Sequence, residues 1–155
     1  MLTGAGILAA GGRWDETPLC HTSRAADTMT TAMSPHSVGV TTDRAVAALA
    51  RRGIELFARV DHGGGARRAG LKLADEELLI FGDPRVGTLL MQSDPRVGYE
   101  LPLRLLVWDD GGQTMVGYRP AVELAEDYEL AAQRGVLENM DGLLAQILAE
   151  SVTPE

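Results

Sequence analysis

The sequence predicts an α+β fold in which helices cover a small mixed β-sheet, with elements in the rough order β-α-β-(α)-β-α-β-β-α-α. Three observations support this prediction. Runs of β-branched, aromatic and other apolar residues at 54–60 and 77–81 are typical of strands. Two further apolar runs flank Gly111 and Gly112, which indicates a hairpin. Apolar residues recur at helical spacing over 136–151, the clearest helical pattern in the chain.

The first half of the chain shows start and stop signals for its elements. A helix is expected over 43–52, with Thr41 or Thr42 as its N-cap and Gly53 in the left-handed conformation after its end. The stretch "ARRAG" predicts a short helix that is closed by Gly70. The strand after it, "ELLIF", is nearly continuous in apolar residues, which is typical of a strand covered on both faces.

The second half is expected to contain a short helix over 85–92, the hairpin and two closing helices. The first closing helix is predicted over about 120–133, with Pro120 in its first turn and Gly135 beyond its end. The second closing helix is the amphipathic segment at 136–151.

The length of 155 residues favours a single domain. Residues 1–36 mix Gly, Ser, Thr and Ala without periodicity, so a poorly ordered N-terminal tail is expected there. Residues 37–152 are expected to form one compact α+β domain.

Charge and cysteine content narrow the class of protein. The formal net charge is −8 and no basic stripe occurs, which argues against binding to nucleic acid or to an anionic membrane. No run approaches about 18 apolar residues, so no transmembrane segment is predicted. Cys20 is the only cysteine, which excludes an intrachain disulfide and a zinc site built from several cysteines. Cytoplasmic localisation is the expectation.

A candidate ligand site follows from the connection between the strands at 54–60 and 77–81. This connection has 16 residues and contains a predicted helix, so it is long enough for a parallel crossover. The loops Asp61–Gly65 and Gly82–Thr88 would then leave neighbouring strands at the same edge, where ligands of open α/β sheets bind. An antiparallel pairing would place the loops at opposite ends of the sheet. The candidate ligand-binding residues are Asp61, His62, Asp83, Arg85 and Thr88.

His62 has two interpretations. It could act as a general base or as a haem or metal ligand, or it could be a turn residue bonded to backbone. The following glycines resemble the oxyanion segment of some hydrolases, but no Gly-x-Ser-x-Gly motif and no later histidine exist. No metal site is evident, catalytic residues are unassigned, and whether the protein is an enzyme stays open.

The pentapeptide Asp-Pro-Arg-Val-Gly occurs twice, at 83–87 and 94–98. In the first copy, Asp83 and Pro84 predict an N-cap and a first helical position. That helix start is either an anion site or is occupied by the Asp83 side chain itself. The second copy is expected to form a turn that leads into a strand, so the two copies are predicted to differ in structure.

Several motifs in fixed order resemble the domain of unknown function 302 family. They are the "DH" of Asp61 and His62, "FGDPRVGTLLM", the second "DPRVG" and "LPL", followed by a strand that ends near Trp108. Asp83 stands where the family usually has Asn, and Glu100 where it usually has Asp. The resemblance covers about 37–152 and implies a small compact α+β fold and a homodimer, without an established reaction.

Some members of that family carry a covalently attached haem, whose attachment motif Cys-x-x-Cys-His is absent here. The predicted function is an unassigned cytoplasmic, homodimeric binding module for a small molecule, with its site at the two loops. The alternative is a haem-binding, metal-binding or enzymatic protein that uses His62.

Overall fold

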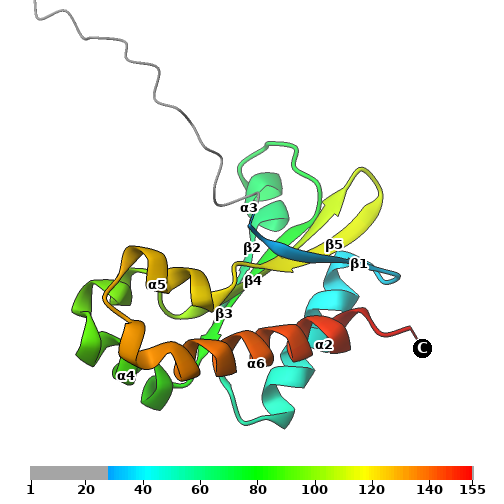
Figure 1. The fold of residues 1–155 in the computed structure, drawn as a ribbon. Coiled ribbons are helices and arrows are strands. Elements are labelled where there is room, and N and C mark those ends of the chain that lie inside the picture. Colours follow the sequence, from blue (N-terminus) through cyan, green and yellow to red (C-terminus); the bar gives the residue numbers. More distant parts are fainter. Residues whose placement is uncertain (1–27, 155) are drawn as a thin grey trace, which may run out of the picture.

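The computed structural model describes residues 28–154, which form a five-stranded sheet with helices packed against it (Figure 1). The order of the strands across the sheet is β1-β5-β4-β3-β2. The strands are β1 (Thr30–Ser34), β2 (Glu55–Asp61), β3 (Glu76–Gly82), β4 (Leu103–Asp110) and β5 (Gln113–Tyr118).

The helices are α2 (Val38–Arg51), α3 (His62–Arg68), α4 (Pro84–Ser93), α5 (Leu124–Asp127) and α6 (Arg134–Val152). Three short 3-10 helices lie between them: η1 (Pro95–Tyr99), η2 (Ala121–Glu123) and η3 (Ala131–Gln133). The α+β class predicted from the sequence is confirmed.

Two helices, α2 and α6, cover one face of the sheet and form the main core (Figure 1). Leu79, Phe81 and Leu105 from the central strands are fully buried beneath Leu49 and Leu144 of these helices. Burying large apolar side chains in this way is the main source of folding free energy.

A second apolar cluster lies beyond the end of the sheet, between α4, η1 and α6. Its fully buried members are Leu90, Val97, Leu130 and Leu137. This cluster holds the segment 83–102 against the C-terminal part of the chain.

The predicted mixed sheet is wrong, because every strand pair is antiparallel. In particular, β2 and β3 pair antiparallel, with Glu55 opposite Gly82 and Asp61 opposite Glu77. The connection between them is long enough for a parallel crossover, but it returns the chain to the sheet at the end where β2 finishes, so β3 runs back alongside β2. Connection length permits a crossover and does not require one.

The predicted tail contains a strand that sequence reasoning missed. β1 pairs antiparallel with β5, from Thr30 opposite Tyr118 to Ser34 opposite Thr114. The domain therefore begins before residue 37, and residues 1–27 of the predicted tail lie outside the described residues. The sequence "TTAMS" has weak alternation, so only pairing with β5 reveals the strand.

The first predicted helix also begins earlier than expected. Ser37, not Thr41 or Thr42, is the N-cap of α2 and accepts a hydrogen bond from the Val40 amide. Thr41 and Thr42 are buried inside the helix, where the Thr42 hydroxyl donates to the Val38 carbonyl at 2.8 Å. Gly53 follows the helix with φ of +64°, as predicted.

The predicted continuous helix over 120–133 is wrong. After α5 the chain becomes extended at Tyr128 (φ −130°, ψ 157°) and resumes as η3. Tertiary hydrogen bonds explain the break: the Glu129 amide donates to Asp94 at 3.1 Å and the Tyr128 hydroxyl to Glu100 at 3.1 Å. The final helix was predicted correctly, although Gly135 lies inside it.

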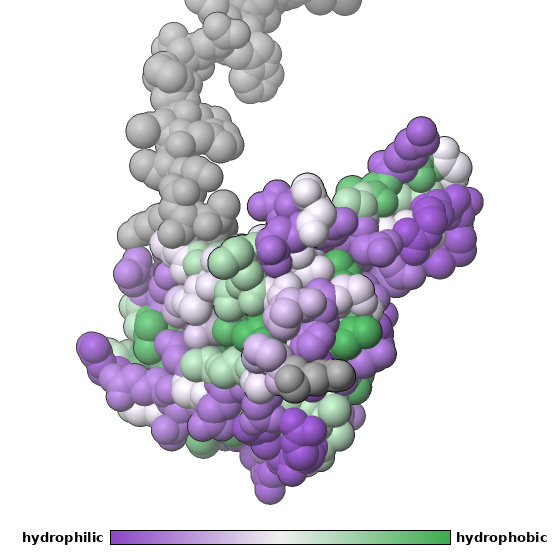
Figure 2. Space-filling view, turned by 90° about the vertical axis from the view of Figure 1, so that its right-hand side faces the viewer, coloured by the Kyte–Doolittle hydropathy of each residue, from purple (hydrophilic) through white to green (hydrophobic). Residues whose placement is uncertain are grey.

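The surface is not uniformly polar. Figure 2 shows hydrophobic residues in patches between hydrophilic ones on one side of the molecule. Large exposed apolar side chains occur on several elements, including Met33 and Leu71, each 67% exposed, and Tyr99, 84% exposed. Single exposed apolar residues are normal on a protein surface, so only those that gather around a cavity are considered further.

The ends of α2 and α6 are joined by an ion-pair cluster in which Glu150 binds Arg51 and Arg52. Hydrogen bonds from both guanidinium groups lower the pKa of Glu150 from its ordinary 4.5 to about 2. A carboxyl group whose pKa is lower in the folded state than in the unfolded state stabilises the fold at pH values above its unfolded pKa. This stabilisation is lost as the pH falls from about 4.5 towards 2.

We therefore expect Glu150→Gln to lower the melting temperature at about pH 7 and to have little effect near pH 2. Glu138→Gln, on the exposed side of the same helix, is the matched control and should change the melting temperature little at either pH. Thermal unfolding followed by circular dichroism measures both. An equal loss for Glu150→Gln at the two pH values would contradict the assignment.

Candidate functional site

The two loops predicted to form one site lie at opposite ends of the sheet. Asp61 ends β2 beside Glu77, whereas Asp83 follows Gly82, which pairs with Glu55. Along β2, Glu55 and Asp61 are six residues apart, which corresponds to about 20 Å at 3.3–3.4 Å per residue. The structure therefore brings Asp61 and His62 together, and separately Asp83, Arg85 and Thr88.

At the first loop, Asp61 is the N-cap of α3 and accepts a hydrogen bond from the Gly64 amide at 2.6 Å. A Cβ at Gly64 would overlap this carboxylate, and one at Gly63 would lie 3.1 Å from the Ala74 carbonyl oxygen. These glycines therefore allow close packing of the helix start. The exposed His62 occupies the first position of α3, and its use as a base, haem ligand or metal ligand stays a prediction.

At the second loop, Asp83 is the N-cap of α4, as predicted. Its carboxylate accepts from the Arg85 amide at 2.9 Å and from the Arg85 guanidinium at 2.7 Å, which lowers its pKa. The Thr88 hydroxyl donates to the Pro84 carbonyl at 2.6 Å. The Asp83 side chain thus occupies the helix start, and the polar groups of this loop bind one another.

The second pentapeptide repeats this geometry, contrary to the prediction that it is a turn of a different kind. Asp94 is the N-cap of η1, Pro95 begins the helix, and Arg96 folds back onto the carboxylate at 2.8 Å. The two copies differ in burial: the Asp94 side chain is 4% exposed and that of Asp83 20%. Asp94 also accepts from the Glu129 amide, and its pKa is held well below the ordinary value, mainly by Arg96.

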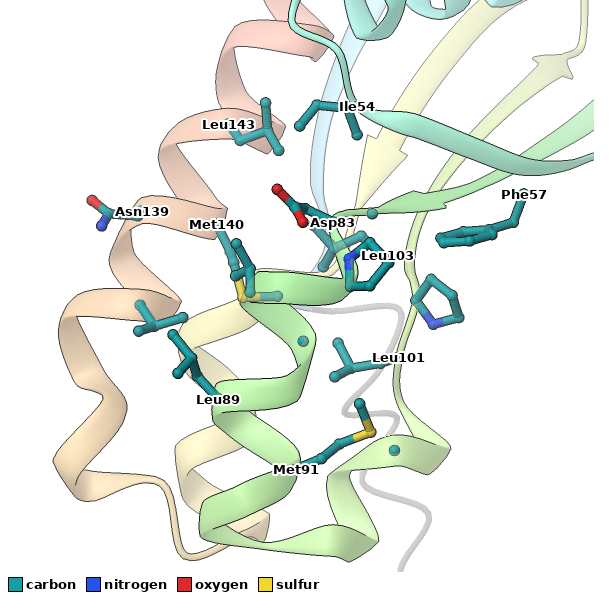
Figure 3. Close-up of a pocket in the computed structure, with 17 residues that line it drawn as sticks. Ile54, Phe57, Asp83, Leu89, Met91, Leu101, Leu103, Asn139, Met140 and Leu143 are labelled. Atoms are coloured by element: carbon teal, nitrogen blue, oxygen red, sulfur yellow. The ribbon is translucent and has the colours of Figure 1, made fainter.

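Between the two pentapeptides and α6 lies a pocket of about 500 Å³ (Figure 3). A volume of this size is typical of small-molecule sites. Its walls come from four parts of the chain: the start of β2, α4, the segment from η1 to β4, and α6. The side chains that face it are mostly apolar and include Ile54, Phe57, Val86, Leu89, Met91, Leu101, Leu103, Val136, Met140 and Leu143.

Glycines keep this pocket open. Gly87 and Gly98, the last residues of the two pentapeptides, both line it together with Gly82. A Cβ at Gly98 would lie 3.2 Å from the Met91 sulfur, and one at Gly87 would lie 3.6 Å from Leu101. Larger side chains at these positions would therefore enter the cavity.

Polar groups in the pocket wall are few. Asp83 is the one charged residue among those that line it, and its carboxylate is engaged by Arg85. Asn139 is the other polar side chain of the lining, and Figure 3 shows its amide apart from the apolar group. Among residues 28–154, no cationic side chain lines the cavity, so this part of the wall does not match a carboxylate or a phosphate group.

Sequence reasoning found the Asp83 loop and missed the pocket beside it. One signal was present in the sequence: Leu89, Leu90 and Met91 are three consecutive apolar residues on a helix. Such a run covers more than one face. Leu90 is buried in the core, whereas Leu89 and Met91 are 44% and 38% exposed and line the pocket. The contributions of Phe57 and Met140 depend on tertiary packing.

In the part of the chain that the structure describes, no group of three or more His, Cys, Asp or Glu residues could hold a metal ion. None of the helices in that part is both long and apolar enough to cross a membrane.

Comparison with known proteins assigns a family to this architecture. A model of the family described as "Domain of unknown function DUF302" matches residues 29–147, well over half of the chain. The chain belongs to the DUF302 family. The match includes β1, which confirms that the domain begins before residue 37.

Curated relatives of this DUF302 chain include longer proteins named as channels. "Fluoride-specific ion channel FluC 1" of Brucella suis biovar 1 is 41% identical over 109 residues, 70% of this chain and 43% of that protein. The protein of the same name from Brucella abortus biovar 1 is also 41% identical, over 40% of its length. The chain thus spans about two fifths of the length of these relatives.

A solved structure has the same fold. The crystal structure of an uncharacterized conserved DUF302 protein from Bacillus stearothermophilus has a TM-score of 0.72 and 19% sequence identity. The likeness covers 80% of this chain and 98% of that chain.

The two aspartates of the pentapeptides offer a matched comparison. We expect Asp94→Ala to lower the melting temperature about twice as far as Asp83→Ala, because Asp94 is more deeply buried and also binds the Glu129 amide. Thermal unfolding near pH 7 measures both variants. Equal losses would show that the contact between Asp94 and residue 129 adds nothing to stability.

Proposed function

We propose that this DUF302 chain is a binding module for a small, apolar, uncharged molecule. The observation that carries the proposal is the 500 Å³ pocket, whose lining is apolar apart from Asp83 and Asn139. The ligand site therefore includes the predicted loop Gly82–Thr88 and extends from it towards η1 and α6. The loop Asp61–Gly65 lies outside it.

The chemistry of the wall defines the class of ligand. A molecule that buries about 200 Å² of apolar surface there gains roughly 5 kcal/mol of transfer free energy, against which the entropy cost of association is set. An anionic head group would meet Asp83 and no lining cation, whereas a hydrocarbon or an aromatic ring would meet matching side chains.

The test uses the neutral fluorescent probe N-phenyl-1-naphthylamine. We expect saturable fluorescence enhancement with one site per chain, weakened at least about tenfold by Gly87→Leu, whose side chain would extend into the pocket. The control is Gly142→Leu, which places the same side chain in open space on α6.

Absence of saturable binding, or equal binding by the two variants, would rule out this pocket as the site. Circular dichroism of both variants shows whether the fold is retained.

A second candidate function follows from the curated relatives. In proteins named as fluoride-specific channels, the DUF302 match occupies about two fifths of the length, and the rest of each protein lies outside it. Domains joined in one chain commonly act together. We therefore propose that this chain acts as the partner domain of a fluoride-channel polypeptide.

This second proposal is tested with the Brucella suis relative from which the matched segment has been deleted. We expect the present chain to co-purify in detergent with the shortened relative, and less with the full-length one, whose own segment competes. No retention on the shortened relative would exclude association in trans.

A further inference from the structure

A second cavity, which we call the charged pocket, lies between the start of β4 and the segment that follows β5. Its volume is about 240 Å³, and its lining combines four apolar residues with three charged ones. Sites for drug-sized molecules typically have volumes of about 300–1,000 Å³, so this cavity suits a smaller ligand, of about the size of one amino acid.

The apolar part of the charged pocket comes from Leu103, Pro120, Ala121 and Leu124. Ala121 and Leu124 are buried members of the second apolar cluster, so they form a fixed surface at the base of the cavity. An aliphatic group of a ligand would be shielded from water by this surface, which favours its binding.

Arg104 supplies an unpaired positive charge at this pocket. Within residues 28–154, its guanidinium donates only to the Tyr99 and Glu100 carbonyl oxygens, at 3.4 and 3.3 Å, which is longer than the usual hydrogen bond. No carboxylate in this range forms an ion pair with it. Because the Arg104 side chain is also exposed, its charge is available to the carboxylate of a ligand.

Glu100 supplies a negative charge with one oxygen still able to accept a hydrogen bond. Its Oε1 accepts from the Tyr128 hydroxyl at 3.1 Å, whereas its Oε2 lies 3.8 Å from Arg119 Nη1, too far for a hydrogen bond. Burial and the bond to Glu100 raise the pKa of Tyr128, so the phenol keeps its proton at neutral pH and holds the carboxylate in place. Oε2 can therefore bind an ammonium group.

The third charged residue of the lining, Arg119, is already neutralised. Its guanidinium binds Glu123 at 3.0 Å and Asp127 at 3.4 Å. One positive and one negative charge are left for a ligand, at Arg104 and Glu100. A simple anion would be repelled by Glu100 and a simple amine by Arg104, whereas a molecule that carries both charges matches both residues.

We propose that the charged pocket binds a free α-amino acid with an aliphatic side chain. The ligand's carboxylate would bind Arg104, its ammonium group would bind Glu100, and its side chain would lie on Leu103 and Leu124. The inference goes beyond the proposed apolar ligand and rests on a different cavity, although Leu103 lines both.

The test is isothermal titration calorimetry with three probes that share one aliphatic group. L-leucine carries both charges, 4-methylpentanoate lacks the ammonium group, and 3-methylbutylamine lacks the carboxylate. We expect saturable binding of L-leucine with one site per chain. The two analogues should bind at least about tenfold more weakly, because each leaves one charge of the pocket unmatched.

Two variants remove the charges of the protein one at a time. Arg104→Gln and Glu100→Gln should each weaken binding of L-leucine at least about tenfold. Arg104→Gln should also bind L-leucine and 3-methylbutylamine about equally, because the contact with the carboxylate is then gone. The matched control is Arg68→Gln, which replaces an exposed arginine of α3 and should bind L-leucine as the wild type does.

No saturable heat with L-leucine at about 10 mM overturns the proposal. So does equal binding of L-leucine and 4-methylpentanoate, or wild-type affinity in an Arg104→Gln variant that is folded by circular dichroism. Binding of N-phenyl-1-naphthylamine to the first pocket is measured separately, so failure of one site is distinguished from failure of the other.

Discussion

The antiparallel pairing of β2 with β3 determines how the second half of the chain is arranged. It sends the chain out of β3 at the end of the sheet opposite to α3, so α4 and η1 lie beyond the sheet and not over it. The two long helices α2 and α6 then cover one face, and α6 extends past the sheet to meet α4. The pocket exists because these segments meet there with glycines between them.

The repeated pentapeptide acquires its meaning from this arrangement. Each copy begins a helix with the same aspartate cap and the same arginine folded back on it. Each copy also ends in a glycine that lines the same cavity, Gly87 in one and Gly98 in the other. The buried Asp94 additionally accepts a hydrogen bond from the Glu129 amide, where the predicted helix is interrupted. The chain then continues into α6, which forms one wall of the pocket. Local capping and pocket construction are thus performed by the same residues.

The proposed ligand site uses apolar side chains that the main core does not bury. Phe57, Leu89 and Met91 are exposed and line the cavity. The net charge of −8 is carried largely on the C-terminal segment, whereas the cavity is lined mostly by apolar side chains. Such a wall is suited to an apolar ligand.

Sequence patterns were enough to predict the α+β class, the strands β2 and β3, the hairpin at Gly111, the final helix and the cap at Asp83, because these depend on local periodicity and turn chemistry. Sequence patterns did not predict the direction of β3 relative to β2, the addition of β1 to the sheet or the break after α5. Each of these depends on contacts between residues far apart in the chain, such as the strand pairing of Thr30 with Tyr118 and the hydrogen bond from the Glu129 amide to Asp94. For the same reason the sequence pointed to one loop of the candidate site, and only packing of that loop against α6 revealed the pocket.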